Sequence, residues 1–137
     1  MDLQLAGKVA LITGSSRGIG LATAKALAAE GCRLMLSARS AEQLAEAAAA
    51  LRTSGVDVAA HPADVSKPDE AAGLVQAAVT AFGGIDVLIN NVGGGGGGAR
   101  IADSTDDDWR SAMERNLIQT ARMMRLGYVE KFDKSQL

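Results

Sequence analysis

The stretch KVALITGSSRGIG, residues 8–20, decides the fold of this chain. Its first six residues are almost all apolar and do not alternate with polar ones, a pattern typical of a short strand buried on both faces of a parallel sheet. A turn with three glycines follows. The Ala- and Leu-rich segment after it, residues 21–30, stops at Gly31, as a helix with a glycine C-cap does. The stretch therefore predicts a strand, a glycine turn and a helix, in that order.

The rest of the chain repeats this alternation. Short apolar runs predict further strands at 33–37, 56–60 and 85–89. Helices are expected from Ser40, which forms a capping box with Gln43, to about 54, at 66–82 with Pro68 in the first turn, and at 105–126. A run of glycines at 93–98 predicts a flexible loop. Alternating strands and helices imply right-handed crossovers, so the predicted fold class is α/β, a doubly wound parallel sheet with helices on both faces.

Composition and charge narrow the possible partners. The chain has 137 residues, 47% of them hydrophobic and 22% charged, which suits one folded domain. Its net charge is −2 and it has no dense basic run, so nucleic acid is not an expected partner. No apolar run reaches the roughly 18 residues of a membrane span, and the first residues do not resemble a secretory signal. We expect a soluble, cytoplasmic protein with no membrane partner.

Two residue types with reactive side chains occur once each. A single cysteine, Cys32, cannot form an internal disulfide, and its place at the start of a strand predicts an inert, buried residue. The only histidine, His61, has no Cys or carboxylate neighbours at ligand spacing. The sequence predicts no metal site.

The glycine turn is suited to bind a pyrophosphate. Backbone N–H groups and the positive end of a helix dipole face the anion there, and glycines let the backbone approach it closely. The spacing, Thr-Gly-x-x-x-Gly-x-Gly, differs from the Gly-x-Gly-x-x-Gly of other dinucleotide-binding folds. Here the chain resembles the short-chain dehydrogenase/reductase family. The resemblance implies a Rossmann-type domain whose turn contacts the cofactor through Thr13, Gly14, Ser16, Arg17, Gly18, Ile19 and Gly20.

The end of the second predicted strand bears on the choice between NAD and NADP. An acidic residue there would accept hydrogen bonds from a ribose 2′-hydroxyl and favour NAD. This chain has Ala38 followed by Arg39. The resemblance implies that Arg39 and Arg17 hold the 2′-phosphate of NADP, because guanidinium groups form charge-assisted hydrogen bonds worth about 1.5 to 3 kcal/mol each. We expect NADP to be preferred over NAD by at least about tenfold. Each arginine could instead be an ordinary surface charge.

Three later segments also match the family. Asp64 and Val65 follow the third predicted strand, where the family places an aspartate that meets the adenine amino group. The next segment is similar to the family's Asn-Asn-Ala-Gly signature beside the cofactor ribose, and it reads Asn90, Asn91, Val92 and Gly93. Residues 109–117 resemble the family's long interface helix, and Asn116 matches the asparagine of its catalytic tetrad.

The other catalytic residues of the family are not identified. The resemblance implies hydride transfer between a nicotinamide and a small-molecule carbonyl or alcohol substrate, assisted by a Ser and by a Tyr-x-x-x-Lys pair. Tyr128 is followed at the fourth position by Phe132, with Lys131 one place early. We therefore expect a partial cofactor domain at 1–126, truncated after the fourth strand and the helix that follows it, and an irregular tail at 127–137. Loss of the general acid alone predicts a rate lower by about 10² to 10⁴.

The fourth predicted strand is central in the family's sheet, and here no later strand is available to pair with it. An open apolar edge invites pairing with another chain. We expect a homo-oligomer, aggregation or poor stability of the isolated chain.

Three hypotheses about function remain open. The first is an NADP-dependent oxidoreductase, similar to 3-oxoacyl-thioester reductases, represented by its amino-terminal half. The second is a non-catalytic NADP-binding or interaction module from a truncated reductase gene. The third, a parallel α/β domain without a nucleotide, requires four independent motif matches to be coincidental.

Overall fold

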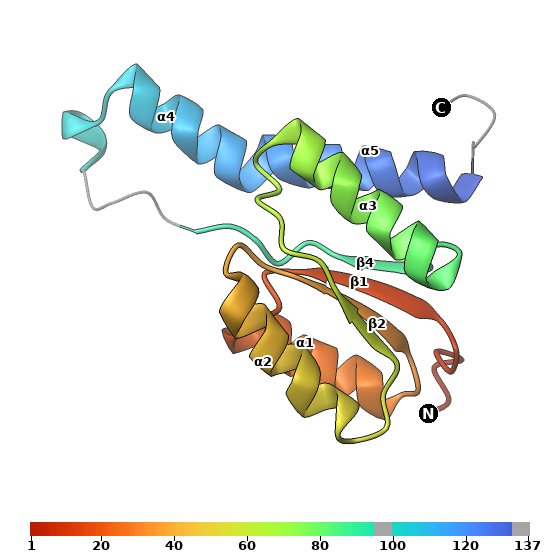
Figure 1. Cartoon of the computed structure of the whole chain (residues 1–137). Helices are drawn as coiled ribbons and strands as arrows, with labels where there is room; N and C mark the ends of the chain where they lie inside the picture. Colours follow the sequence, from red (N-terminus) through yellow and green to blue (C-terminus); the bar gives the residue numbers. More distant parts are fainter. Residues whose placement is uncertain (95–99, 133–137) are drawn as a thin grey trace.

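The computed structural model describes residues 1–94 and 100–132 of the chain (Figure 1). Strands and helices alternate in its first two thirds, as the sequence predicts, and helices make up the rest. The elements are β1 (Val9–Thr13), α1 (Gly18–Ala29), β2 (Arg33–Ser37), α2 (Ala41–Arg52), β3 (Val58–Ala60), α3 (Pro68–Phe82), β4 (Val87–Ile89), η1 (Ile101–Asp103), α4 (Asp106–Met113), η2 (Glu114–Ile118) and α5 (Gln119–Phe132).

The strands within these ranges form one parallel sheet in the order β3-β2-β1-β4. The chain moves outward from β1 through β2 to β3, and then returns to place β4 on the other side of β1. Leu11 of β1 is aligned with Met35 of β2 and with Leu88 of β4. The reversal between β1 and β4 is a topological switch point, and ligands of open α/β sheets bind at the carboxyl ends of strands beside such a point.

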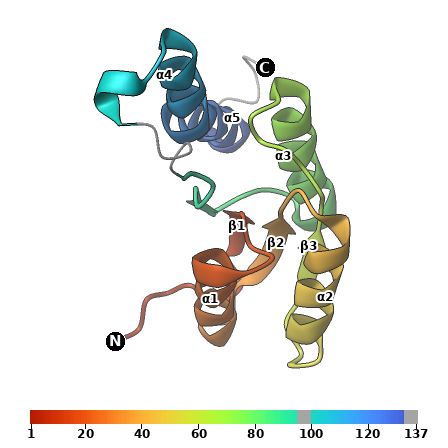
Figure 2. The same cartoon turned by 90° about the vertical axis from the view of Figure 1, so that its left-hand side faces the viewer.

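Helices cover both faces of the sheet (Figures 1 and 2). Successive residues of a strand point to opposite faces, so Ile12 packs with Leu44 of α2, whereas Leu11 packs with Leu74 of α3 and Met123 of α5. The largest fully buried side chains of these two clusters are aliphatic or Met. The α/β fold class predicted from the sequence is therefore confirmed.

The end of the chain differs from the prediction. An irregular tail was expected from Gly127, but α5 continues to Phe132, so the expectation is wrong for residues 127–132; residues 133–137 lie outside the described part. The helix continues because its last turns pack on the sheet. Gly127 lies close to Leu88 of β4, and the buried carboxylate of Glu130 accepts a hydrogen bond from the N–H of Ile85 at 3.2 Å.

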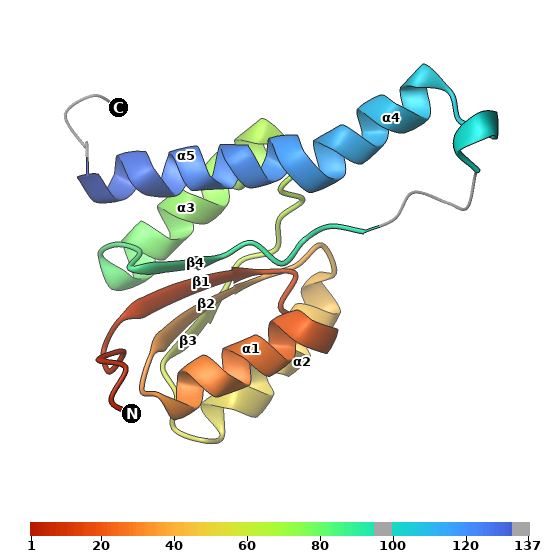
Figure 3. The ribbon, with the colours of Figure 1, turned by 180° about the vertical axis from the view of Figure 1, so that it is seen from behind.

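The long helix expected at 105–126 is not uniform. It begins with the predicted cap, in which Thr105 and Asp108 form a reciprocal capping box. It then passes through η2, a π-helical segment, before α5 begins (Figure 3). The helix α4 extends past the edge of the sheet, away from the layer formed by α3 and α5 (Figure 3).

Smaller differences concern the ends of elements. The third and fourth strands begin two residues later than expected, at Val58 and Val87, and α1 begins at Gly18 in place of Leu21. The glycine loop expected at 93–98 lies outside the described residues from 95 onward. In the described part of the chain, no helix is long and apolar enough to cross a lipid bilayer.

Candidate functional site

The glycine turn lies between β1 and α1, at the switch point of the sheet. Gly14 and Gly18 have φ angles of +64° and +58°, which L side chains rarely adopt. Arg17 occupies the N-cap position of α1 and its side chain makes no capping hydrogen bond. The first N–H bonded within this helix is that of Leu21, which reaches the Arg17 carbonyl. The N–H groups of residues 18–20 therefore have no partner inside the helix, and they carry its positive dipole end.

Gly20 is required for close packing, not for a special backbone angle. A Cβ atom at this position would lie 2.2 Å from the carbonyl oxygen of Gly14 and 2.6 Å from Nδ2 of Asn91. The same Asn91 Nδ2 donates a hydrogen bond of 3.0 Å to the Gly14 carbonyl. The helix, the turn and the segment after β4 thus meet where only glycine fits.

Thr13, the last residue of β1, fixes the turn to the end of β4. It is buried, and its Oγ1 accepts a 3.1 Å hydrogen bond from the N–H of Asn91 and donates one of 3.4 Å to the carbonyl of Ile89. Thr13 therefore links the ends of β1 and β4 beneath the site.

Ser15 has a role for which the sequence offered no signal beyond its place in the turn. It is fully buried and its Oγ donates to the carbonyl of Ile12 at 2.8 Å. The N–H of Ser37, at the end of β2, donates to the same Oγ at 3.0 Å. Ser15 thereby ties the turn to the second strand.

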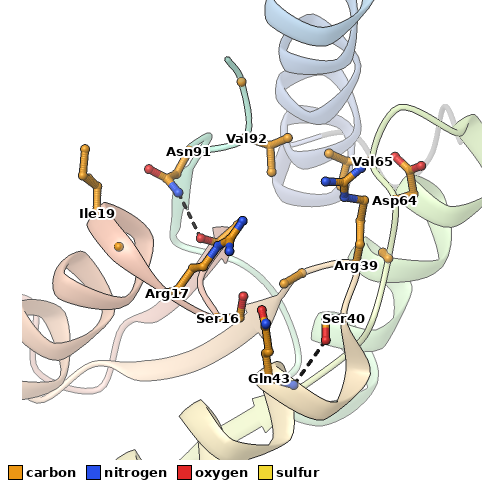
Figure 4. Close-up of a pocket in the computed structure, with 15 residues that line it drawn as sticks. Ser16, Arg17, Ile19, Arg39, Ser40, Gln43, Asp64, Val65, Asn91 and Val92 are labelled. Atoms are coloured by element: carbon orange, nitrogen blue, oxygen red, sulfur yellow. Dashed lines mark hydrogen bonds between the residues drawn. The ribbon is translucent and has the colours of Figure 1, made fainter. Parts of the chain in front are cut away.

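A cavity of about 740 Å³ opens above this turn (Figure 4). It is lined by the turn and the start of α1, by the segment from the end of β2 into α2, and by the segments that follow β3 and β4. Of the predicted cofactor residues, those on its wall are Gly14, Ser16, Arg17, Gly18, Ile19, Arg39, Asp64, Val65, Asn91 and Gly93. Five other residues complete the wall and were not predicted to contact the cofactor themselves: Ala38, Ser40, Gln43, Ala63 and Val92. Four predicted residues are not on the wall: Thr13, Gly20, Asn90 and Asn116.

The missed residues are neighbours of predicted ones or lie at the start of α2. Ser40 caps that helix by accepting a 3.3 Å hydrogen bond from the N–H of Gln43. Both side chains line the cavity and are labelled in Figure 4. The sequence identifies this serine only as a helix cap, because no local pattern shows whether a capping residue also lines a cavity.

Charge on the cavity wall is mainly positive. Arg17 comes from the N-terminal end of α1 and Arg39 from the segment before α2 (Figure 4). Among the described residues that line the cavity, Asp64 is the only one with a carboxylate. Hydrogen bonds from Ser66, from its hydroxyl at 2.7 Å and from its N–H at 3.1 Å, lower the pKa of Asp64, and the charges of Lys67 and then Arg39 lower it further. The wall thus combines two guanidinium groups with one ionised carboxylate.

Asn116 lies in the π-helical segment η2, outside the cavity wall. Its Oδ1 accepts from the N–H of Gly94 at 3.0 Å, and its Nδ2 donates to the Gly94 carbonyl at 3.1 Å and to the Ala112 carbonyl at 3.0 Å. The amide therefore holds the segment that leads away from the cavity. Within the described ranges, no group of three or more His, Cys, Asp or Glu side chains could hold a metal ion.

Comparison with known proteins supports the family resemblance. Residues 8–135 match the short chain dehydrogenase family. The structure is similar to that of L-sorbose reductase from Gluconobacter frateurii in complex with NADPH and L-sorbose, with a TM-score of 0.86 and 40% identity over 91% of this chain and 48% of that one. It is also similar to actinorhodin polyketide ketoreductase with NADPH, with a TM-score of 0.83 and 38% identity over 89% of this chain and 46% of that one.

A third similar structure binds the other nicotinamide cofactor. This short-chain dehydrogenase/reductase from Burkholderia phymatum, in complex with NAD, has a TM-score of 0.83 and 35% identity over 90% of this chain and 44% of that one. The chain spans about half the length of the curated relatives it matches, for example 40% of one and 47% of another.

From the turn, the strand order and the family match together, we conclude that the chain is a Rossmann-type domain and belongs to the short-chain dehydrogenase family.

Proposed function

We propose that this chain is the NADP-binding part of a carbonyl reductase, similar in type to the ketoreductases it resembles. The observation that carries the proposal is the pair of guanidinium groups, Arg17 and Arg39, on the wall of a cavity at the switch point of the sheet. Two of the similar structures contain NADPH and one contains NAD. The preference for NADP therefore depends on these two arginines and on Ala38, which stands where an acidic residue would favour NAD.

The shape of the site fits a dinucleotide. The contact between Gly20 and Gly14 leaves no room for a side chain, which brings the N-terminal end of α1 close to the turn. The N–H groups of residues 18–20 can then bind the pyrophosphate. We assign the 2′-phosphate to Arg17 and Arg39, and the adenine to Asp64 and Val65. The nicotinamide ribose would lie beside Asn90, Asn91 and Gly93.

When bound, the cofactor supplies hydride to a carbonyl or accepts it from an alcohol. The residues of this chain bind and orient it. The hydrogen bonds of the buried residues Thr13 and Ser15 hold the strand ends in place before the cofactor arrives, so less ordering is required on binding.

Titration of the purified chain with NADPH and NADH tests the proposal. We expect NADPH to bind at least about tenfold more tightly. Arg39→Gln should weaken NADPH about tenfold and change NADH by less than about twofold, because only NADPH carries the 2′-phosphate. Lys25→Gln is a matched control, since this exposed residue of α1 also loses one positive charge. Equal affinities of the wild type for both cofactors would contradict the NADP preference, and binding of neither would overturn the proposal.

A second candidate is a dinucleotide-binding module that performs no reduction. The specific observation in its favour is that Tyr128 contacts Phe132, the residue four places later, with tilted rings whose centroids lie 5.1 Å apart on an exposed part of α5. No Lys stands at that position. A carbonyl-substrate assay on the sample used for the titration separates the candidates, because tight NADPH binding without turnover favours the module.

We also propose that the chain associates with copies of itself. In the described part of the sheet, β4 pairs with β1 and with no further strand. Large apolar side chains at helical spacing are exposed on the helices beyond it, and we call them the apolar row: Trp109, Met113, Leu117, Met124 and Tyr128. Covering such a row in a contact between two copies removes apolar surface from water.

The cytoplasmic location expected from the sequence stays a prediction.

A further inference from the structure

Arg122 of α5 is a largely enclosed basic side chain near the cavity, and no sequence motif accounts for it. Only 12% of its side chain is exposed. Its Nη1 donates to the carbonyls of Val65 and Ser66, each at 3.1 Å, and its Nη2 donates to Oε1 of Glu114 at 3.0 Å. One guanidinium therefore joins α5, the first residue of η2 and the segment between β3 and α3.

The segment that Arg122 holds forms one wall of the cavity. Val65 is buried and lies on that wall beside Asp64. Ser66, whose carbonyl accepts from Arg122, donates both its N–H and its hydroxyl to Oδ1 of Asp64. A continuous series of hydrogen bonds thus runs from the guanidinium through Ser66 to the carboxylate at the cavity.

The opposite wall is held by the same helix. Gln119 lies three residues before Arg122 and is also buried. Its Nε2 donates to the carbonyl of Val92 at 3.1 Å, and Val92 is part of the cavity wall. One face of α5 therefore contacts two segments of the cavity wall, residues 65–66 and Val92, that are far apart in sequence.

We propose that Arg122 is a positioning residue for cofactor binding, which holds the Asp64–Ser66 wall in the geometry that receives the adenine half. This inference rests on the proposed function of the site. An arginine forms this contact because its planar group can donate to two carbonyls and a carboxylate at once, which a lysine cannot do in the same geometry. Without the guanidinium, the carbonyls of Val65 and Ser66 lose this donor, and the segment that contains them loses its attachment to α5.

The test compares Arg122→Met with Arg125→Met, a control on the exposed side of the same helix. The probes are NADPH and adenosine 2′,5′-bisphosphate, which represents the adenine half alone. We expect Arg122→Met to weaken both probes by the same factor, about tenfold, and Arg125→Met to change neither by more than about twofold. Arg122→Lys should recover part of the affinity, since it keeps one donor. Unchanged affinity of Arg122→Met for both probes, with or without a lower unfolding temperature, would overturn the inference.

A second measurement asks whether Arg122 acts through Asp64. Asp64→Asn should cost less affinity in the Arg122→Met background than in the wild type, because the wall is already displaced. Additive losses would overturn the inference. If Arg122→Met does not fold, Glu114→Gln replaces it, since this change removes the ion pair and leaves the contacts of Arg122 with the two carbonyls. The affinity for both probes should then fall about two- to threefold. An unchanged affinity would count against the inference. A wild-type chain that binds neither probe contradicts the proposed function itself, which distinguishes the two failures.

Discussion

Gly20 illustrates how a single atom determines whether the turn and the first helix can pack. Gly20→Ala would place a Cβ 2.2 Å from the Gly14 carbonyl oxygen, a backbone atom that cannot move without the turn. We expect the free energy of unfolding to fall by about 2 to 3 kcal/mol, as overpacking in a close contact does. Urea denaturation followed by circular dichroism measures it.

Gly73→Ala is the matched control for this prediction. Gly73 lies inside α3, and the nearest atom to an added Cβ is Nε2 of His61 at 4.0 Å. Alanine there should stabilise the protein by about 0.5 to 1 kcal/mol, because it has a higher helix propensity. If the two alanine variants had similar stabilities, the contact at Gly20 would not have the role described.

At the scale of elements, a buried carboxylate attaches the C-terminal part of α5 to the segment just before β4. Glu130 accepts from the N–H of Ile85, and both residues are about 5% exposed. Glu130→Ala leaves a buried donor without this acceptor, which we expect to lower the free energy of unfolding by about 1 to 3 kcal/mol. Chemical denaturation measures the loss.

Glu130→Gln separates the hydrogen bond from the rest of the contact. Its amide oxygen can still accept from Ile85, so it should retain more stability than the alanine variant. The expected order of stability is wild type, then Gln, then Ala. An alanine variant within about 0.5 kcal/mol of the wild type would show that α5 does not depend on this attachment.

At the scale of the whole molecule, two features predict self-association: the apolar row, and the side of β4 that pairs with no strand in the described part of the chain. Size-exclusion chromatography with light scattering should give a mass larger than that of one chain. Leu117, in the middle of the row, is 53% exposed, and Leu117→Lys should shift the equilibrium toward the monomer by placing a charge in the contact. Leu3→Lys, at a leucine that is 49% exposed near the N-terminus, should not. A wild-type chain that is a stable monomer at all concentrations contradicts the prediction.

Much of the molecule could be predicted from local patterns. The alternation of strands and helices, the glycine turn and the helix caps at Ser40 and Thr105 depend on residues close in sequence, and such signals can be read directly. The end of α5 could not be predicted in this way. Its last turns contain Gly127, Tyr128 and the charged residues Glu130 and Lys131, a composition that predicts an irregular segment. They are helical because Glu130 is buried against Gly84 and Ile85, just before β4, and because Met123 earlier in α5 is buried with Leu74 of α3. No local pattern reveals these contacts.

The sequence by itself determined the fold class and the candidate cofactor turn, because strand burial and glycine conformation depend on neighbouring residues. It also indicated the residues of most of the cavity wall. Only the tertiary structure decided that Asn116 contacts Gly94, that Ser15 joins two strands and that Arg122 holds the wall at Asp64. Each of these contacts joins residues that are 22 or more positions apart. The physical reason is that a hydrogen bond between distant segments requires the sheet to be assembled first.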